Sequence, residues 1–119
     1  MQPVDRNPAF LWDMLEACRM ILQFIEGKTY QQYLDDPLLQ SAVERKLEVI
    51  GEAARRVSED YQQQHPEISW RSLIGLRNIL IHEYGEVRQD RIWLILQDHV
   101  PVLVGRLTGL IPPLPVDED

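Results

Sequence analysis

The stretch FLWDMLEACRMILQFI, residues 10–25, decides the fold class. Its apolar residues return every three or four positions, which is the spacing of side chains along one face of an α-helix. Asn7 is a candidate cap before this stretch, Pro8 suits the first helical turn, and Gly27 is a typical stop. The pattern therefore predicts a first helix that ends at Gly27.

Three further stretches carry apolar stripes of the same period, and none of them alternates as a β-strand would. The polar residues 28–36 leave room for one extra turn. Because the connections are short, the stripes favour an all-α fold, an antiparallel four-helix bundle. The stripes predict a second helix over residues 37–63, a third from Ser69 to about residue 84, and a fourth from residues 87–90 to residue 110.

Prolines mark two positions in the last quarter of the chain. Pro101 lies inside the fourth stripe, where a proline removes a backbone hydrogen bond at a cost of about 3 kcal/mol. We therefore expect a kink between Asp98 and Val102. The Pro-rich acidic stretch 112–119 cannot continue the helix, so we expect one helical domain over residues 1–111 and a disordered tail after it.

Composition limits the classes to which the protein can belong. The chain of 119 residues is 45% hydrophobic and 26% charged, which suits one globular domain. Cys18 is the single cysteine, and no Cys/His cluster has the spacing of zinc ligands, so no metal site is expected. The sequence has neither a signal-peptide pattern nor an apolar run of about 20 residues, and we expect a cytoplasmic protein.

The net charge of −7 argues against broad, sequence-indifferent nucleic-acid binding, which depends on Lys and Arg beside phosphates. The charge is uneven, however. Residues 71–91 carry four arginines against three acidic residues, and the rest of the chain is strongly acidic. The sequence therefore allows an anionic substrate to bind locally within that segment.

Residues 77–84, RNILIHEY, gather an arginine, an amide, a histidine and a phenol. By helical spacing Arg77 shares the apolar stripe of this segment, and a buried arginine needs a partner, with Glu48 and Glu52 as candidates. His82 lies about 140° around an ideal helix from Arg77, so the two side chains would point apart. An internal ion pair for Arg77, and a structural hydrogen bond for His82 at a helix end, stay open as alternatives to a site.

The run Arg77-x-x-x-x-His82-x-Tyr84 resembles the signature of HEPN ribonucleases, in the form found in the HepT-like toxins. Four other parts of the chain agree with the resemblance, and together they extend it over nearly the whole sequence. These parts are residues 42–54, residues 65–71, residues 75–78, and Trp93 followed by Val100-Pro101.

The resemblance implies a HEPN-like helical bundle that forms a homodimer, with Arg77 and His82 of both protomers in a cleft at the interface. It implies a metal-independent endoribonuclease without a cofactor, whose substrate RNA supplies the nucleophilic 2′-hydroxyl. His82 would be the general acid or base, Arg77 would hold the phosphate, and Asn78 would support them. Such a toxin leaves a cyclic phosphate on its product and does not cleave DNA.

The resemblance also implies a partner, an MntA-like nucleotidyltransferase antitoxin that transfers AMP from ATP to the tyrosine of the motif, here Tyr84. Two other functions remain as alternatives. One is a non-catalytic HEPN-type helical module that binds a nucleotide or a nucleotidyltransferase. The other is a dimeric scaffold, in which Arg77 and His82 would be buried and paired within one chain, whereas either functional interpretation predicts an open polar groove.

Overall fold

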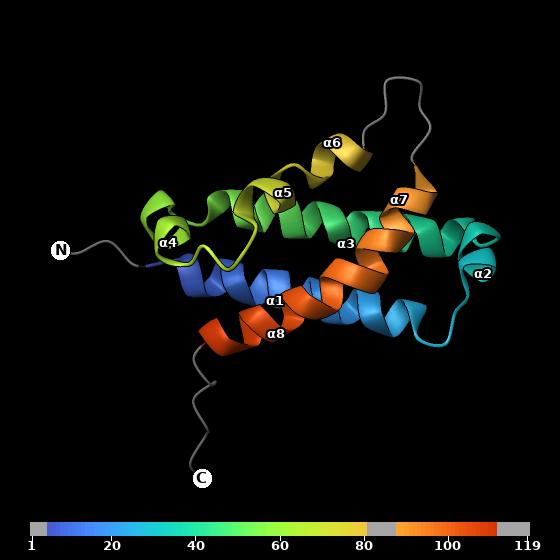
Figure 1. Cartoon of the computed structure of the whole chain (residues 1–119), viewed down its shortest axis with the longest axis horizontal. Helices are drawn as coiled ribbons and strands as arrows, with labels where there is room; N and C mark the ends of the chain where they lie inside the picture. The colour runs from blue at the N-terminus through green and yellow to red at the C-terminus, as the bar shows by residue number, and fades with distance from the viewer. Residues whose placement is uncertain (1–4, 81–87, 112–119) are drawn as a thin grey trace, which may run out of the picture.

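The protein is described by a computed structural model, which covers residues 5–80 and 88–111. Within these ranges the chain is all helical, as the periodicity predicts (Figure 1). The elements are α1 (Asn7–Ile25), α2 (Tyr30–Leu34), α3 (Pro37–Arg56), α4 (Glu59–Gln64), α5 (Trp70–Ile74), α6 (Leu76–Leu80), α7 (Gln89–Leu94), the π-helical turn η1 (Ile95–His99) and α8 (Val100–Leu110).

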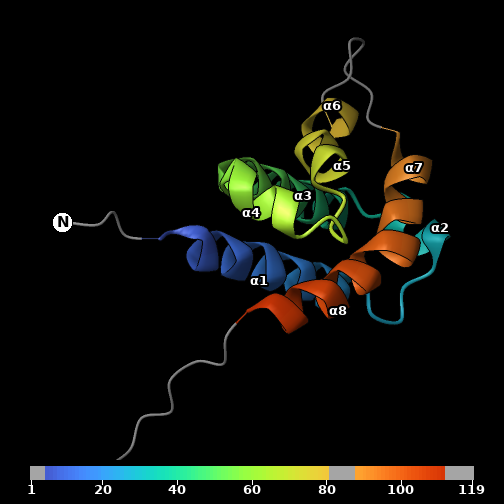
Figure 2. The ribbon, with the colours of Figure 1, turned by 60° about the vertical axis from the view of Figure 1, so that its left-hand side comes forward.

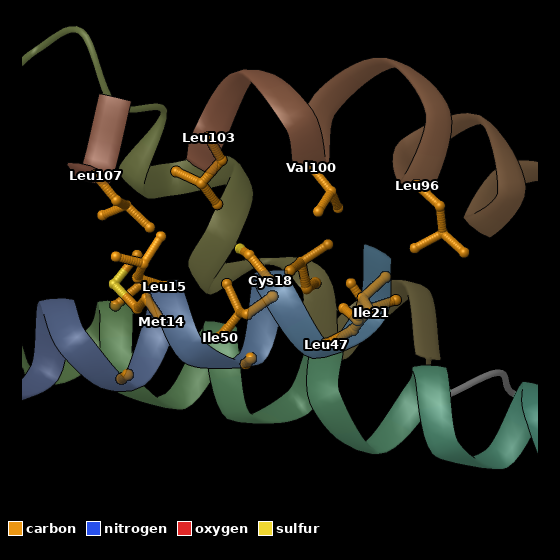
Figure 3. Close-up of a cluster of buried hydrophobic side chains, with 14 of the residues drawn as sticks. Met14, Leu15, Cys18, Ile21, Leu47, Ile50, Leu96, Val100, Leu103 and Leu107 are labelled. Carbon is orange, nitrogen blue, oxygen red and sulfur yellow. The ribbon is translucent and has the colours of Figure 1, made fainter. Parts of the chain in front are cut away.

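The two long helices α1 and α3 run antiparallel and pack side by side, and α8 crosses α1 (Figure 1). Their contact faces form the core, in which each fully buried aliphatic side chain contributes about 1.5–3 kcal/mol. Figure 3 shows side chains of η1 and α8 pointing onto those of α1 and α3. The residues labelled there are Met14, Leu15, Cys18, Ile21, Leu47, Ile50, Leu96, Val100, Leu103 and Leu107.

Cys18 lies at the centre of this cluster with no exposed surface (Figure 3). Burial disfavours the thiolate and raises the pKa of the Cys18 thiol to about 12. The single cysteine therefore behaves as a small apolar core residue.

The first helix begins one residue earlier than the sequence suggests, because Arg6 and not Asn7 is the cap residue. The Asn7 side chain instead joins α1 to the start of α4. Its Nδ2 donates to Ser58 Oγ at 3.0 Å, and its Oδ1 accepts from the backbone N–H of Ser58 at 3.0 Å. Gly27 follows the helix as expected, with a φ of 72° that favours glycine.

The expected extra turn is present as α2. A capping box begins it, since Thr29 Oγ1 accepts from the backbone of Gln32 at 3.1 Å and Gln32 Oε1 accepts from the backbone of Thr29 at 2.8 Å. The sequence Thr-x-x-Gln already carries this signal.

The prediction of one helix over residues 37–63 is wrong, because the chain breaks between α3 and α4. Val57 leaves the helical region, with φ −65° and ψ 137°, while its side chain stays buried. Ser58 then caps α4 by accepting from the backbone of Tyr61 at 3.3 Å. The break turns the chain back toward α1, where Asn7 holds Ser58.

The third predicted helix is also divided, into α5 and α6, with Gly75 between them. Ser69 precedes α5 but makes no side-chain capping hydrogen bond, contrary to its expected role. The predicted end near residues 84–85 lies outside the described residues.

The fourth helix starts at Gln89, inside the predicted window, and the disturbance expected between Asp98 and Val102 takes the form of the wider turn η1, which begins at Ile95 and overlaps that window at Asp98 and His99. Pro101 has no N–H, and its ring crowds the carbonyl four residues earlier. The backbone accommodates this by a π-turn in which the N–H of Val100 donates to the carbonyl of Ile95. The predicted tail, residues 112–119, lies outside the described residues.

No helix in the described ranges is long and apolar enough to span a membrane.

Candidate active site

Arg77 reaches the surface from α6, which lies over α3 (Figure 1). The expectation that Arg77 belongs to a buried stripe is wrong, because its side chain is exposed while Leu76 and Leu80 are buried. The break at Gly75 starts a new helix at Leu76, and α6 turns its two leucines inward. Arg77 consequently faces outward.

A glycine on α3 allows α5 to approach closely, and α6 follows directly from α5. A Cβ on Gly51 would lie 2.9 Å from the carbonyl oxygen of Leu73, which is closer than real Cβ contacts. Any side chain at position 51 would push α5 away. Gly51 thus sets the distance between α3 and α5. Because α6 follows α5, it also helps to set the position of Arg77 relative to α3.

Arg77 lines a hollow of 450 Å³ where α1, α3, α5 and α6 meet. We call it the arginine hollow. Its charged lining residues are Arg45, Arg55, Arg56, Arg77, Asp13, Glu48 and Glu52. Its remaining lining residues are Phe10, Val49, Gly51, Ala53 and Ile74.

Three of the four arginines in the hollow are paired with glutamates of α3. Arg45 Nη1 lies 3.3 Å from Glu48 Oε2. Glu52 Oε1 accepts from Arg55 Nη2 at 2.7 Å and from Arg56 Nε at 3.2 Å, and these hydrogen bonds, first that of Arg55, lower the pKa of the Glu52 carboxyl. Within the described part of the chain, Arg77 pairs with neither Glu48 nor Glu52, so the internal ion pair considered from the sequence is not formed.

Asn78 is exposed beside Arg77 on α6, and its backbone N–H donates to the carbonyl of Gly75 at 2.9 Å. It is not among the residues that line the arginine hollow. His82 and Tyr84, the other two residues singled out from the motif, lie outside the described residues. Of the predicted site residues, the structure therefore places Arg77 and Asn78 together on the surface of α6.

A buried tyrosine holds the start of α7, which the sequence did not reveal as a contact. The Tyr33 hydroxyl donates to Gln89 Oε1 at 2.5 Å, and Gln89 Nε2 donates to Glu44 Oε2 at 3.4 Å. Burial, with a smaller effect of Glu44, raises the pKa of Tyr33. The Tyr33 ring also packs on Trp93, with 5.2 Å between ring centroids. This network ties the start of α7 to α2 and α3.

A second, mostly apolar groove of 530 Å³ lies between the α5–α6 pair and the α7–α8 arm, with α3 also lining it. Figure 2 shows these two pairs of helices on neighbouring sides of the molecule. Leu94 and Val102 line the groove although they are 58% and 49% exposed. We call it the apolar groove.

In residues 5–80 and 88–111, no group of three or more His, Cys, Asp or Glu residues is arranged to hold a metal ion.

Comparison with known proteins places the chain beside ribonucleases. A family model described as "Ribonuclease HepT-like" matches residues 14–107. The protein named "Putative RNase MJ1380" from Methanocaldococcus jannaschii is 37% identical over 93 residues, which cover 78% of this chain and 85% of that protein. The "Probable ribonuclease HepT" of Thermococcus cleftensis is 36% identical over 101 residues, covering 85% of this chain and 92% of that protein. No solved structure matches the chain.

Proposed function

The chain belongs to the HepT-like ribonuclease family, and from this premise we propose that it is a metal-independent endoribonuclease, the cytoplasmic toxin of a toxin–antitoxin pair. The observation that carries the proposal is the exposure of Arg77 in a hollow rich in arginine. A scaffold would bury and pair this residue, whereas a ribonuclease needs it at the surface to meet a phosphate.

The chemistry needs no metal because the nucleophile belongs to the substrate. The 2′-oxygen of the ribose attacks the adjacent phosphorus as its proton passes to a base, and the bond from phosphorus to the 5′-oxygen breaks as that oxygen takes up a proton. The products are a 2′,3′-cyclic phosphate and a free 5′-hydroxyl. We assign the proton transfers to His82 and the binding of the phosphate oxygens to Arg77, whose planar guanidinium suits them. Asn78, beside Arg77, would support it.

Two copies of the chain would complete the site. In a dimer with one shared cleft, the His82 of one protomer can accept the proton while that of the other donates one. The exposure of Leu94 and Val102 in the apolar groove supports association, because apolar patches on small proteins commonly mark contact surfaces.

The test is cleavage of a labelled RNA, with DNA of the same sequence and a chelator in parallel. Wild-type protein should cut the RNA with the chelator present, leave the DNA intact and form the cyclic phosphate. His82→Ala should slow cleavage by about 10²–10⁴-fold and Arg77→Ala by about 10²–10³-fold. Circular dichroism should show that both variants remain folded.

Arg19→Ala is the matched control, since Arg19 is an exposed arginine of α1 outside the arginine hollow. It should cleave RNA as fast as the wild type. If Arg77→Ala and His82→Ala do the same, neither residue is catalytic. If neither the wild type nor any variant cleaves RNA, and the protein binds a mononucleotide tightly, the non-catalytic, nucleotide-binding alternative is favoured instead.

A further inference from the structure

The arginine hollow extends beyond what cleavage of one bond requires. Arg77 alone can hold the scissile phosphate, yet three more arginines of α3 line the same hollow. Building on the proposed function, we propose that the arginine hollow is a subsite for the RNA strand next to the scissile phosphate. Arg45, Arg55 and Arg56 bind its phosphates, and the apolar side chains of the lining receive a base.

The dimensions suit a piece of a nucleic-acid strand. The volume of 450 Å³ lies within the range of about 300–1,000 Å³ that is common for small-molecule pockets. Arg45 and Arg55 are ten residues apart on α3, which corresponds to about 15 Å along the helix at 1.5 Å per residue. Arginines spread along a helix in this way suit a chain with repeated charges better than a single small anion.

Part of the lining of the hollow is apolar. Phe10 of α1, Val49 of α3 and Ile74 of α5 line it, and all three are partly exposed while they pack against the core. An aromatic ring beside arginines is the usual surface on which proteins hold unpaired bases without choosing a sequence. Phe10 is the ring available here.

The charge balance also favours a polyanion. Four arginines face three carboxylates in the hollow, although the chain as a whole has a net charge of −7. The ion pairs of Arg45, Arg55 and Arg56 are exposed, with arginine side chains 58–72% accessible, and such pairs are weak. An arginine can therefore exchange its glutamate for a phosphate at little cost.

The experiment measures binding apart from cleavage. His82→Ala protein serves as the background, so that a fluorescent single-stranded RNA of twelve nucleotides stays intact, and its anisotropy gives Kd at several salt concentrations. Arg45→Gln, and Arg55→Gln with Arg56→Gln, should each raise Kd by about tenfold and flatten its salt dependence. The logarithmic slope should fall by roughly 0.7 for each phosphate that the variant no longer neutralises. Phe10→Leu should raise Kd without changing that slope.

Two further variants separate the subsite from a general effect of charge. Arg19→Gln removes the same charge from another face of α1 and should leave Kd within twofold. Glu52→Gln removes a carboxylate from the hollow and should lower Kd, because Arg55 and Arg56 lose their competing partner. In the wild-type background, Arg45→Gln should raise KM and leave kcat nearly unchanged.

The subsite and the proposed function can fail separately. If the hollow variants bind RNA as Arg19→Gln does, the subsite is wrong, even where wild-type protein cuts RNA. If they lose binding while the wild type cuts nothing, the subsite stands and the ribonuclease does not. Variants that keep RNA binding but lose a partner protein would make the hollow a protein interface, which also overturns the proposal.

Discussion

Arg77 owes its position to its neighbours in the sequence more than to any bond of its own. Leu76 and Leu80 anchor α6 in the core, and Arg77, which directly follows Leu76, faces the solvent. A side chain held this way can be exchanged with little loss of stability, since surface substitutions usually change the free energy of unfolding by less than about 0.5 kcal/mol. Function and stability are therefore separable at this residue.

Tyr84 is the residue at which we expect regulation, by a nucleotidyltransferase partner that would transfer AMP from ATP to the tyrosine hydroxyl and release pyrophosphate. The group would add bulk and a negative phosphate beside the motif, so RNA would meet both obstruction and repulsion. Intact-mass analysis of the chain co-expressed with the partner should show added AMP that disappears in Tyr84→Phe. That variant should still cut RNA yet escape inhibition.

Tyr33→Phe is a poor substitute as a control, because loss of the Tyr33 hydroxyl also breaks its bond to Gln89. Tyr30→Phe is better, since Tyr30 is 36% exposed and its ring merely packs near Trp93. It should leave the amount of AMP unchanged. AMP found on Tyr30 or Tyr61, or none on the chain, would refute the assignment to Tyr84.

For single residues, the sequence indicated Arg77 as a site residue but misjudged its burial. Helical spacing counted Arg77 with Leu80 in one continuous stripe, and the restart of the helix after Gly75 shifts that stripe onto Leu76 and Leu80. A period followed along one segment cannot detect such a restart. The placement of His82 and Tyr84 remains a prediction from the motif.

Gly51 controls the contact between two elements, α3 and α5. Gly51→Ala should destabilise the protein by about 1–3 kcal/mol, because the added Cβ would meet the carbonyl of Leu73 at 2.9 Å and force α5 outward. RNA cleavage should fall as well, since α6 and Arg77 follow α5. Urea unfolding and the cleavage assay measure the two effects.

Gly105→Ala is the matched control on α8. A Cβ there meets nothing within 4 Å, and alanine favours a helix over glycine by about 1 kcal/mol. It should therefore stabilise the fold and leave cleavage unchanged. Equal effects of the two substitutions would show that Gly51 has no special packing role.

How well each helix could be predicted depended on where its deciding contacts lie. The apolar period predicted α1 and the start of α7, although it misplaced the cap of α1 by one residue, and the polar stretch after Gly27 left room for α2. These signals lie within a few residues of the elements they define. The breaks after Arg56 and at Gly75 depend on distant partners, since Asn7 binds Ser58 across 51 positions and Gly51 meets Leu73 from another helix. Pro101 signalled a disturbance of the helix, but the sequence did not show that it would take the form of a π-turn over Ile95–His99.

For the whole molecule, we expect a dimer that uses the apolar groove. Leu94→Glu should shift the protein to monomer in sedimentation experiments at micromolar concentration and abolish RNA cleavage, because a charge would enter an apolar contact and the shared cleft would be lost. Circular dichroism should stay unchanged, since Leu94 is 58% exposed in the single chain.

Leu38→Glu provides the comparison. Leu38 is 81% exposed, more than Leu94, but it lies in the first turn of α3 and away from the groove. This variant should remain dimeric and active. Dissociation by Leu38→Glu, or a wild type that sediments as a monomer, would remove the shared cleft and the two-histidine mechanism with it.

The buried thiol of Cys18, between α1 and α8, provides a chemical probe for transient opening of the core. Disulfide reagents attack the thiolate, and burial raises the pKa of the Cys18 thiol so far that the thiolate scarcely forms at pH 8 while the core is closed. The rate at which Cys18 is labelled should therefore report how readily α8 separates from α1. If dimerisation holds α8 in place, dilution below the Kd of the dimer should increase the labelling rate. A labelling rate that does not depend on protein concentration would mean that the core of each chain opens independently of the partner.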